Sequence, residues 1–160
     1  MKHLDFPGVW QIGVIVPDAK KAAEKAIKIF GVEPEYSEFG THSGYEHCNT
    51  RYYGEPTDGS GCNYCFKLGA VEFEFITPIG DPSEKSTWRD FLNEHPKGGI
   101  HHIAWRTENT EEATKLMESE GLPKIQEGWW ATGRYTYFDA IEDMGMTMEL
   151  LQFFDEKEEN

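Results

Sequence analysis

The chain has 160 residues, a formal net charge of −14 and a sequence pI of about 4.8. A nucleic-acid-binding surface needs clustered Lys and Arg, so this acidity argues against nucleic-acid partners and against docking on an anionic membrane. No apolar run has the length of a membrane span, and the N-terminal residues contain no hydrophobic signal core. The three cysteines do not indicate a disulfide framework, so we expect a cytoplasmic protein.

The first half of the chain alternates between strand and helix patterns. A helix is predicted between Asp18, a favourable N-cap, and Gly31, a favourable helix end, because apolar residues recur between them at helical spacing. Residues 40–60 are rich in Gly, Thr, Asn, Pro and Asp and indicate a long irregular connection. The expected elements are strands at 8–16, 32–39 and 51–53, a helix at 19–30, and a hairpin of 63–68 with 71–76.

The second half follows the same plan after a linker at residues 78–86. Asn109 is a candidate cap for its main helix, and Gly121 is placed to end that helix. The expected elements are helices at 87–93 and 111–120, strands at 99–105, 124–127, 133–140 and 146–153, and a turn at 142–145. Each half therefore runs strand, helix, then further strands.

Aligning the two halves places Gln11 opposite His102 and Glu74 opposite Glu149. The intervals are 63 residues (74 − 11) in the first half and 47 (149 − 102) in the second, and the extra length falls in the 40–60 connection. A duplicated unit suggests pseudo-twofold packing, which would bring the four positions around one axis. Taken one at a time, these side chains have ordinary alternatives, such as a hydrogen-bonded glutamine or a glutamate that is solvated or paired with arginine.

Each of these four polar residues interrupts an apolar strand, where an unpaired buried polar group costs several kcal/mol. Side chains alternate along a strand, so the opposite faces, with Trp10, Phe73 and Trp105, are expected to form the core against the helices, and the polar four to line a cleft. An amide, an imidazole and two carboxylates are a plausible ligand set for one divalent cation. Such an ion could polarise a carbonyl and make the neighbouring proton removable.

Two further groups of residues could carry chemistry. The pair Cys62 and Cys65, with Cys48, His42 and His47, could form a zinc knuckle, but residues three apart on a strand point to opposite faces, which favours free thiols. Arginines could hold an anionic group of a substrate, or simply pair with surface acids. The arginine candidates are Arg51, Arg106 and Arg134.

These motifs resemble the vicinal oxygen chelate superfamily, which includes glyoxalase I, methylmalonyl-CoA epimerase and extradiol dioxygenases. The similarity covers about residues 7 to 154 and is most specific at residues 98–105 and 148–152. It implies an α+β fold in one domain, with two tandem βαβββ modules, about 7–80 and 97–154, forming an open U-shaped mixed sheet around a metal, and with 155–160 as an acidic tail. By motif matching, the ligands of one divalent zinc, nickel, cobalt or manganese ion would be Gln11, Glu74, His102 and Glu149.

The resemblance implies a metal-dependent epimerase or isomerase that removes and returns a proton beside a carbonyl through a metal-stabilised enolate. The leading substrate class is a methylmalonyl-CoA-like acyl thioester, with Glu149 as the base, Glu74 on the opposite side, and a homodimer as the expected assembly. The first alternative is a glyoxalase-I-like lyase, which shares the Gln-Glu-His-Glu set but has an arginine for glutathione where this chain has Ile15. The second is a metal-free small-molecule-binding protein of the same fold.

Overall fold

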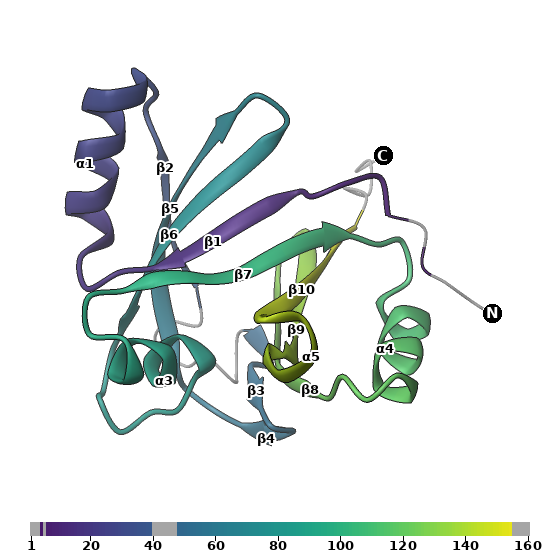
Figure 1. Ribbon diagram of the computed structural model, residues 1–160. Coiled ribbons are helices and arrows are strands. Elements are labelled where there is room, and N and C mark those ends of the chain that lie inside the picture. The colour runs from purple at the N-terminus through teal and green to yellow at the C-terminus, as the bar shows by residue number, and fades with distance from the viewer. Residues whose placement is uncertain (1–3, 5, 40–47, 155–160) are drawn as a thin grey trace, which may run out of the picture.

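The computed structural model describes residue 4 and residues 6–39 and 48–154. The predicted acidic tail at 155–160 and part of the 40–60 connection lie outside this range. Figure 1 shows an open, curled sheet with helices at its sides. In the first module the elements are β1 (Gln11–Ile15), α1 (Ala19–Phe30), β2 (Glu35–Phe39), β3 (Arg51–Tyr52), β4 (Glu55–Pro56), β5 (Ser60–Leu68) and β6 (Val71–Ile79).

The rest of the chain holds a linking helix and the second module, which again runs strand, helix, then further strands. The linking helix is α3 (Thr87–Glu94), and the second module consists of β7 (Gly99–Arg106), α4 (Thr110–Ser119), β8 (Lys124–Trp130), β9 (Gly133–Ala140), α5 (Ile141–Met144) and β10 (Met146–Phe153). The side chain of Asn109 caps α4 by accepting from the Glu112 N–H at 3.1 Å, as Asp18 caps α1 through the Lys21 N–H at 2.9 Å. The turn expected at 142–145 is mostly the short helix α5.

Strands of both modules form one sheet in the order β2-β5-β6-β1-β7-β10-β9-β8-β3-β4 among the described residues. The modules meet where β1 runs antiparallel to β7, while β6 is parallel to β1 and β10 is parallel to β7. The first and last strands of each module therefore lie side by side at the centre (Figure 1). The predicted open mixed sheet of two modules is confirmed.

The long connection of the first module contributes to the far edge of the second. Its hairpin, β3 with β4, pairs with β8, and Arg51 and Tyr52 lie opposite Glu127 and Gln126. The sequence indicated a strand at 51–53 but not its partner. A hairpin from the first module therefore forms the edge of the sheet next to β8 of the second module.

The core lies on both faces of the sheet. On one face, α4 covers a cluster that includes Met117, Phe138 and Leu150. The other face, which carries the four polar residues, holds a second cluster around Trp88 of α3, which is fully buried. This second cluster also contains Ile15, Ile76, Ala104 and Leu151.

The prediction that the opposite strand faces alone would form the core was therefore wrong. Helix α3 packs against the face with the polar residues, so Ile15 is fully buried there while Ile12 and Val14 are only partly buried. Trp10, which precedes β1, lines a cavity instead. No helix in the described part of the chain is long and apolar enough to cross a bilayer.

Candidate functional site

The four predicted ligand residues lie on the four central strands, one on each. β6 carries Glu74, β1 carries Gln11, β7 carries His102 and β10 carries Glu149. Their exposed fractions are 7%, 6%, 0% and 3% in that order. The structure thus brings together all four residues that the alignment of the two halves singled out.

The atoms that face the middle of this group have few partners. His102 Nε2 lies 3.2 Å from Glu149 Oε2 and 3.5 Å from Glu74 Oε2. Neither His102 Nε2 nor Glu149 Oε2 makes a hydrogen bond to any described residue, although both are buried. Buried polar atoms normally have a hydrogen-bond partner, but these two are joined only by an ion pair that lacks hydrogen-bond geometry.

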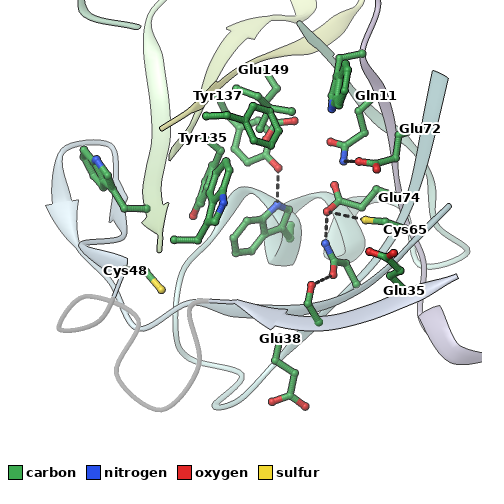
Figure 2. A pocket seen from close by; sticks show the side chains of 18 of the residues that line it. Gln11, Glu35, Glu38, Cys48, Cys65, Glu72, Glu74, Tyr135, Tyr137 and Glu149 are labelled. Atoms are coloured by element: carbon green, nitrogen blue, oxygen red, sulfur yellow. Dashed lines mark hydrogen bonds between the residues drawn. The ribbon is translucent and has the colours of Figure 1, made fainter. Parts of the chain in front are cut away.

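The atoms that face outward are held by neighbours. Gln11 Nε2 donates to Glu72 Oε1 at 2.7 Å, and His102 Nδ1 lies 3.0 Å from His101 Nδ1. One oxygen of Glu74 accepts from the Asn63 amide and lies 3.8 Å from the Cys65 thiol (Figure 2). These contacts fix the orientation of the candidate ligands before anything binds.

The charges in this group act on one another. Burial alone would lower the pKa of His102, but the negative charges of Glu149 and Glu74 outweigh it and raise that pKa to about 9. Burial raises the pKa of Glu149, and the charge of His102 opposes this. Burial, with the charge of His102, lowers the pKa of His101 well below its usual value. His101 is therefore the neutral neighbour of the pair.

A cavity of about 460 Å³ is lined by Gln11, Glu74 and Glu149, whereas His102 lies behind them and does not line it (Figure 2). One wall comes from the first module and is polar, whereas the other comes mainly from the second module and is aromatic. The polar wall includes Glu35, Glu38, Asn63, Cys65, Glu72 and Glu74. The aromatic wall includes Trp129, Trp130, Tyr135, Tyr137 and Phe153.

The predicted substrate-binding arginines differ in their surroundings, and none of the three lines the cavity. The Arg106 guanidinium lies 4.6 Å from the ring centre of Trp10 and 4.4 Å from that of Phe153, both of which line the cavity. Arg134 pairs with Glu111 and, at 3.3 Å, with Glu127, and Arg51 Nη1 donates to the Gly54 carbonyl at 3.0 Å. The Arg134 guanidinium also lies 4.7 Å from the ring centre of Trp129, so Arg106 and Arg134 both stack on rings of the cavity wall.

Sequence reasoning assigned no role to Glu72 or Asn63, and it considered Cys65 only as part of a zinc knuckle or as a free thiol. The signal for Glu72 was available, because it lies two residues before Glu74 and so shares its face of the strand. Asn63 and Cys65 lie on β5, directly opposite residues 76 and 74 of β6, a pairing that requires the hairpin register.

Among the described residues, no group of three or more His, Cys, Asp or Glu side chains has a geometry that could hold a metal ion as it stands. Cys48, Cys62 and Cys65 are free thiols. The other two residues of the suggested zinc knuckle, His42 and His47, lie outside the described residues.

Residues 10–138 match the family model described as the Glyoxalase/Bleomycin resistance protein/Dioxygenase superfamily. The chain belongs to this superfamily. The resemblance seen in the sequence is thereby confirmed at the level of the family. No curated protein matches the chain. The homodimer implied by the resemblance stays a prediction.

Solved structures share the fold at low sequence identity. Methylmalonyl-CoA epimerase from Mycobacterium tuberculosis is 17% identical, with a TM-score of 0.59 over 92% of this chain and 88% of that one. A variant of the Streptomyces coelicolor enzyme, in complex with 2-nitronate-propionyl-CoA, is 16% identical, with a TM-score of 0.61 over 93% and 96%. A hypothetical protein from Bacillus halodurans is 16% identical, with a TM-score of 0.63 over 96% and 98%. At these identities the similarity establishes the fold.

Proposed function

We propose that the protein is a divalent-metal-dependent epimerase or isomerase that removes and returns a proton beside a carbonyl group. The observation that carries this proposal is the buried ion pair of His102 Nε2 and Glu149 Oε2, which lie 3.2 Å apart without a hydrogen bond, with Glu149 lining the cavity. An imidazole nitrogen and a carboxylate oxygen that face each other without a hydrogen bond are what a ligand set presents to an ion.

The spacing of these atoms supports the fit. Ligands about 2.1 Å from one ion are about 3.0 Å apart at right angles and about 3.4 Å apart at a tetrahedral angle. The distances of 3.2 and 3.5 Å from His102 Nε2 to the two carboxylates are close to this range. They exceed the length of a charge-assisted hydrogen bond, about 2.7 to 2.9 Å.

The ligands would be Gln11, Glu74, His102 and Glu149. The hydrogen bond from Gln11 Nε2 to Glu72 leaves the amide oxygen available for an ion (Figure 2). Mixed nitrogen and oxygen ligands suit zinc, nickel, cobalt or manganese. When bound, such an ion would polarise the substrate carbonyl and stabilise the negative charge that develops when the adjacent proton leaves.

Glu149 is the proposed base and Glu74 its counterpart. They reach His102 from two different strands, β10 and β6, so that each can face one side of a substrate in the cavity. Epimerisation needs a proton removed on one side of a carbon and returned on the other. Two carboxylates within 3.5 Å of one imidazole nitrogen could fill these two roles without a third group.

An acyl thioester is the proposed substrate class. Arg106 and Lys67 both lie over the ring of Trp10, at 4.6 and 4.7 Å, and provide positive charge beside the cavity that Trp10 lines. An anionic tail could bind there while the thioester carbonyl reaches the site. One solved neighbour is an epimerase in complex with a propionyl-CoA analogue.

The test combines metal analysis with proton exchange. We expect about one divalent ion per chain, and exchange of the proton beside the carbonyl of methylmalonyl-CoA in D₂O, which EDTA abolishes and the metal restores. Glu149→Gln should slow this exchange about 100-fold or more, whereas Glu142→Gln, an exposed residue of α5, removes the same charge and should leave it unchanged. A protein that holds metal but exchanges no such proton would contradict the proposed reaction.

A glyoxalase-I-like lyase is the second candidate, favoured by the Gln-Glu-His-Glu set. Ile15, at the position of the glutathione-binding arginine, is fully buried in the core and offers no positive charge. Turnover of the glutathione hemithioacetal of methylglyoxal, without proton exchange in acyl thioesters, would favour the lyase. A protein that binds small molecules but no metal would instead be the metal-free binding protein given above as the second alternative.

A further inference from the structure

A β-bulge brings two neighbouring histidines of β7 together. Gly13 of β1 pairs with His102. The next pair is Val14 with Ile100, so the register between β1 and β7 skips His101. Side chains that follow each other in a regular strand point to opposite faces, whereas a bulge redirects one of them. The Nδ1 atoms of the two histidines consequently lie only 3.0 Å apart.

This short distance joins two ring nitrogens, so one of them must donate and the other accept. His102 Nε2 faces the oxygens of Glu149 and Glu74 at 3.2 and 3.5 Å, where it would bind the proposed ion. A neutral imidazole that binds an ion through Nε2 carries its proton on Nδ1. The Nδ1–H of His102 would then donate to His101 Nδ1, which has to carry a lone pair.

The ring of His101 is enclosed by other aromatic rings. Its centre lies 5.1 Å from that of Phe91 on α3 and 5.6 Å from that of Tyr137 on β9, edge to face in both cases. The side chain is buried, with 5% of its surface exposed. Packing on two sides holds the ring, so its Nδ1 is a fixed acceptor.

We infer that His101 is a positioning residue, whose Nδ1 accepts the Nδ1–H of His102 and so holds His102 in the tautomer that presents Nε2 to the ion. Histidines that bind metals usually donate their second N–H to a carboxylate, a carbonyl or water. An imidazole acceptor adds no further negative charge next to Glu74 and Glu149. The inference rests on the proposed function, because it takes His102 as a ligand.

Two substitutions separate this role from mere filling of the core. His101→Phe keeps an aromatic ring but has no acceptor, and we expect zinc affinity in isothermal titration calorimetry to fall about 10- to 100-fold. His101→Asn places an amide oxygen near the position of Nδ1 and should bind zinc within about threefold of the unaltered protein. It also leaves a cavity, so its metal-free form should unfold at a temperature about 5 °C lower or more. The less stable of these variants would thus bind zinc well.

His95 provides the matched control. It is an exposed histidine whose ring packs on the same Phe91 ring, with the two centres 4.5 Å apart. His95→Phe and His95→Asn should leave zinc affinity unchanged. A loss in His95→Phe as large as the loss in His101→Phe would overturn the inference.

Nitrogen-15 NMR spectra of the histidine rings report the tautomer directly. In the zinc-loaded protein we expect His101 to carry its proton on Nε2 and none on Nδ1, with its signals identified by their absence from His101→Asn. A role in packing alone would not fix this tautomer. A proton on His101 Nδ1 would overturn the inference.

The remaining outcomes are also decisive. Unchanged zinc affinity in His101→Phe, or an equal loss of affinity in His101→Phe and His101→Asn, would overturn the inference while the proposed function stands. Zinc binding with the expected difference between the variants, but without proton exchange in thioesters, would support the inference and contradict the proposed reaction. An unaltered protein that binds no zinc would overturn both.

Discussion

Gly13 of β1 lies directly opposite His102 of β7, and the imidazole ring of His102 occupies the space where a side chain at position 13 would be. A Cβ atom there would overlap three atoms of the ring. The candidate metal ligand can lie across β1 only because residue 13 has no side chain. Gly13 is also the partner of Glu74 on the other neighbouring strand, β6.

Gly13→Ala should therefore displace the His102 ring. We expect the affinity for zinc or cobalt to fall about 100-fold or more, and the free energy of unfolding to fall by about 1 to 3 kcal/mol. Isothermal titration calorimetry and denaturant unfolding measure these two effects. Gly99→Ala is the control, since a Cβ there would lie 3.4 Å from the Phe91 ring, an ordinary contact. Unchanged metal affinity in Gly13→Ala would show that the ring is not needed in this position.

Metal-free protein should become less stable as the pH rises above neutral. The folded-state pKa of His102 is raised to about 9, above the ordinary value of 6.5. Its contribution to stability is therefore complete below about pH 6.5 and is lost as the pH rises through about 9. The difference is on the order of 3 kcal/mol, and urea unfolding at pH 6, 8 and 10 in EDTA measures it. His102→Gln should be much less sensitive over this range, and an equally steep decline in that variant would point to other groups.

Metal binding should release protons at pH 7.5. His102 is protonated in the metal-free protein, because its pKa is about 9, and must lose that proton to bind an ion. Calorimetric titrations with zinc in buffers of different ionisation enthalpy should give about one proton per ion. His95→Gln, at an exposed histidine, should give the same value, and His102→Gln should give a lower one. Zero protons released by the unaltered protein would argue against His102 as a ligand.

Glu72 should matter to metal binding without touching the ion. A carboxylate can only accept at neutral pH, so it holds the NH₂ group of Gln11 and leaves the amide oxygen to face the site. Glu72→Gln can satisfy either orientation of that amide, and we expect zinc affinity to fall about 10- to 100-fold. Glu35→Gln removes a charge from the same cavity wall and is the matched control. An equal loss of zinc affinity in the two variants would show that the removed charge, and not the orientation of the Gln11 amide, causes the effect.

Arg106 and Arg134 should respond differently to the same change. Arg106→Gln should raise KM for an acyl-CoA substrate about tenfold with little effect on kcat, because Arg106 stacks on rings of the cavity wall. Arg134 also stacks on a ring of the cavity wall, Trp129, but its charge is held by Glu111 and Glu127. Arg134→Gln should therefore mainly lower thermal stability, because it leaves the buried Glu127 with one partner fewer. Steady-state kinetics and thermal unfolding distinguish these outcomes. A KM that rises only in Arg134→Gln would reverse the assignment.

Local sequence patterns determined much of this fold. Asp18 and Gly31 fixed the helix between them, because an N-cap acceptor and a left-handed helix end act within a few residues. The β9 strand was predicted with its observed bounds. Other bounds were less accurate: β2 begins only after Pro34, and β8 continues to Trp130 rather than ending at residue 127. The second error hid the pairing that places Trp129 and Trp130 against β9.

The internal repeat predicted the four central residues of the candidate site, since equivalent positions in two similar halves lie on the four central strands. What surrounds them was decided by tertiary structure alone. The bond between Gln11 and Glu72 joins residues 61 positions apart, and the β3–β4 hairpin pairs with a strand of the other module. Such contacts leave no periodic signal, because they depend on which strands become neighbours. The acidic and aromatic walls likewise exist only once the sheet has curled.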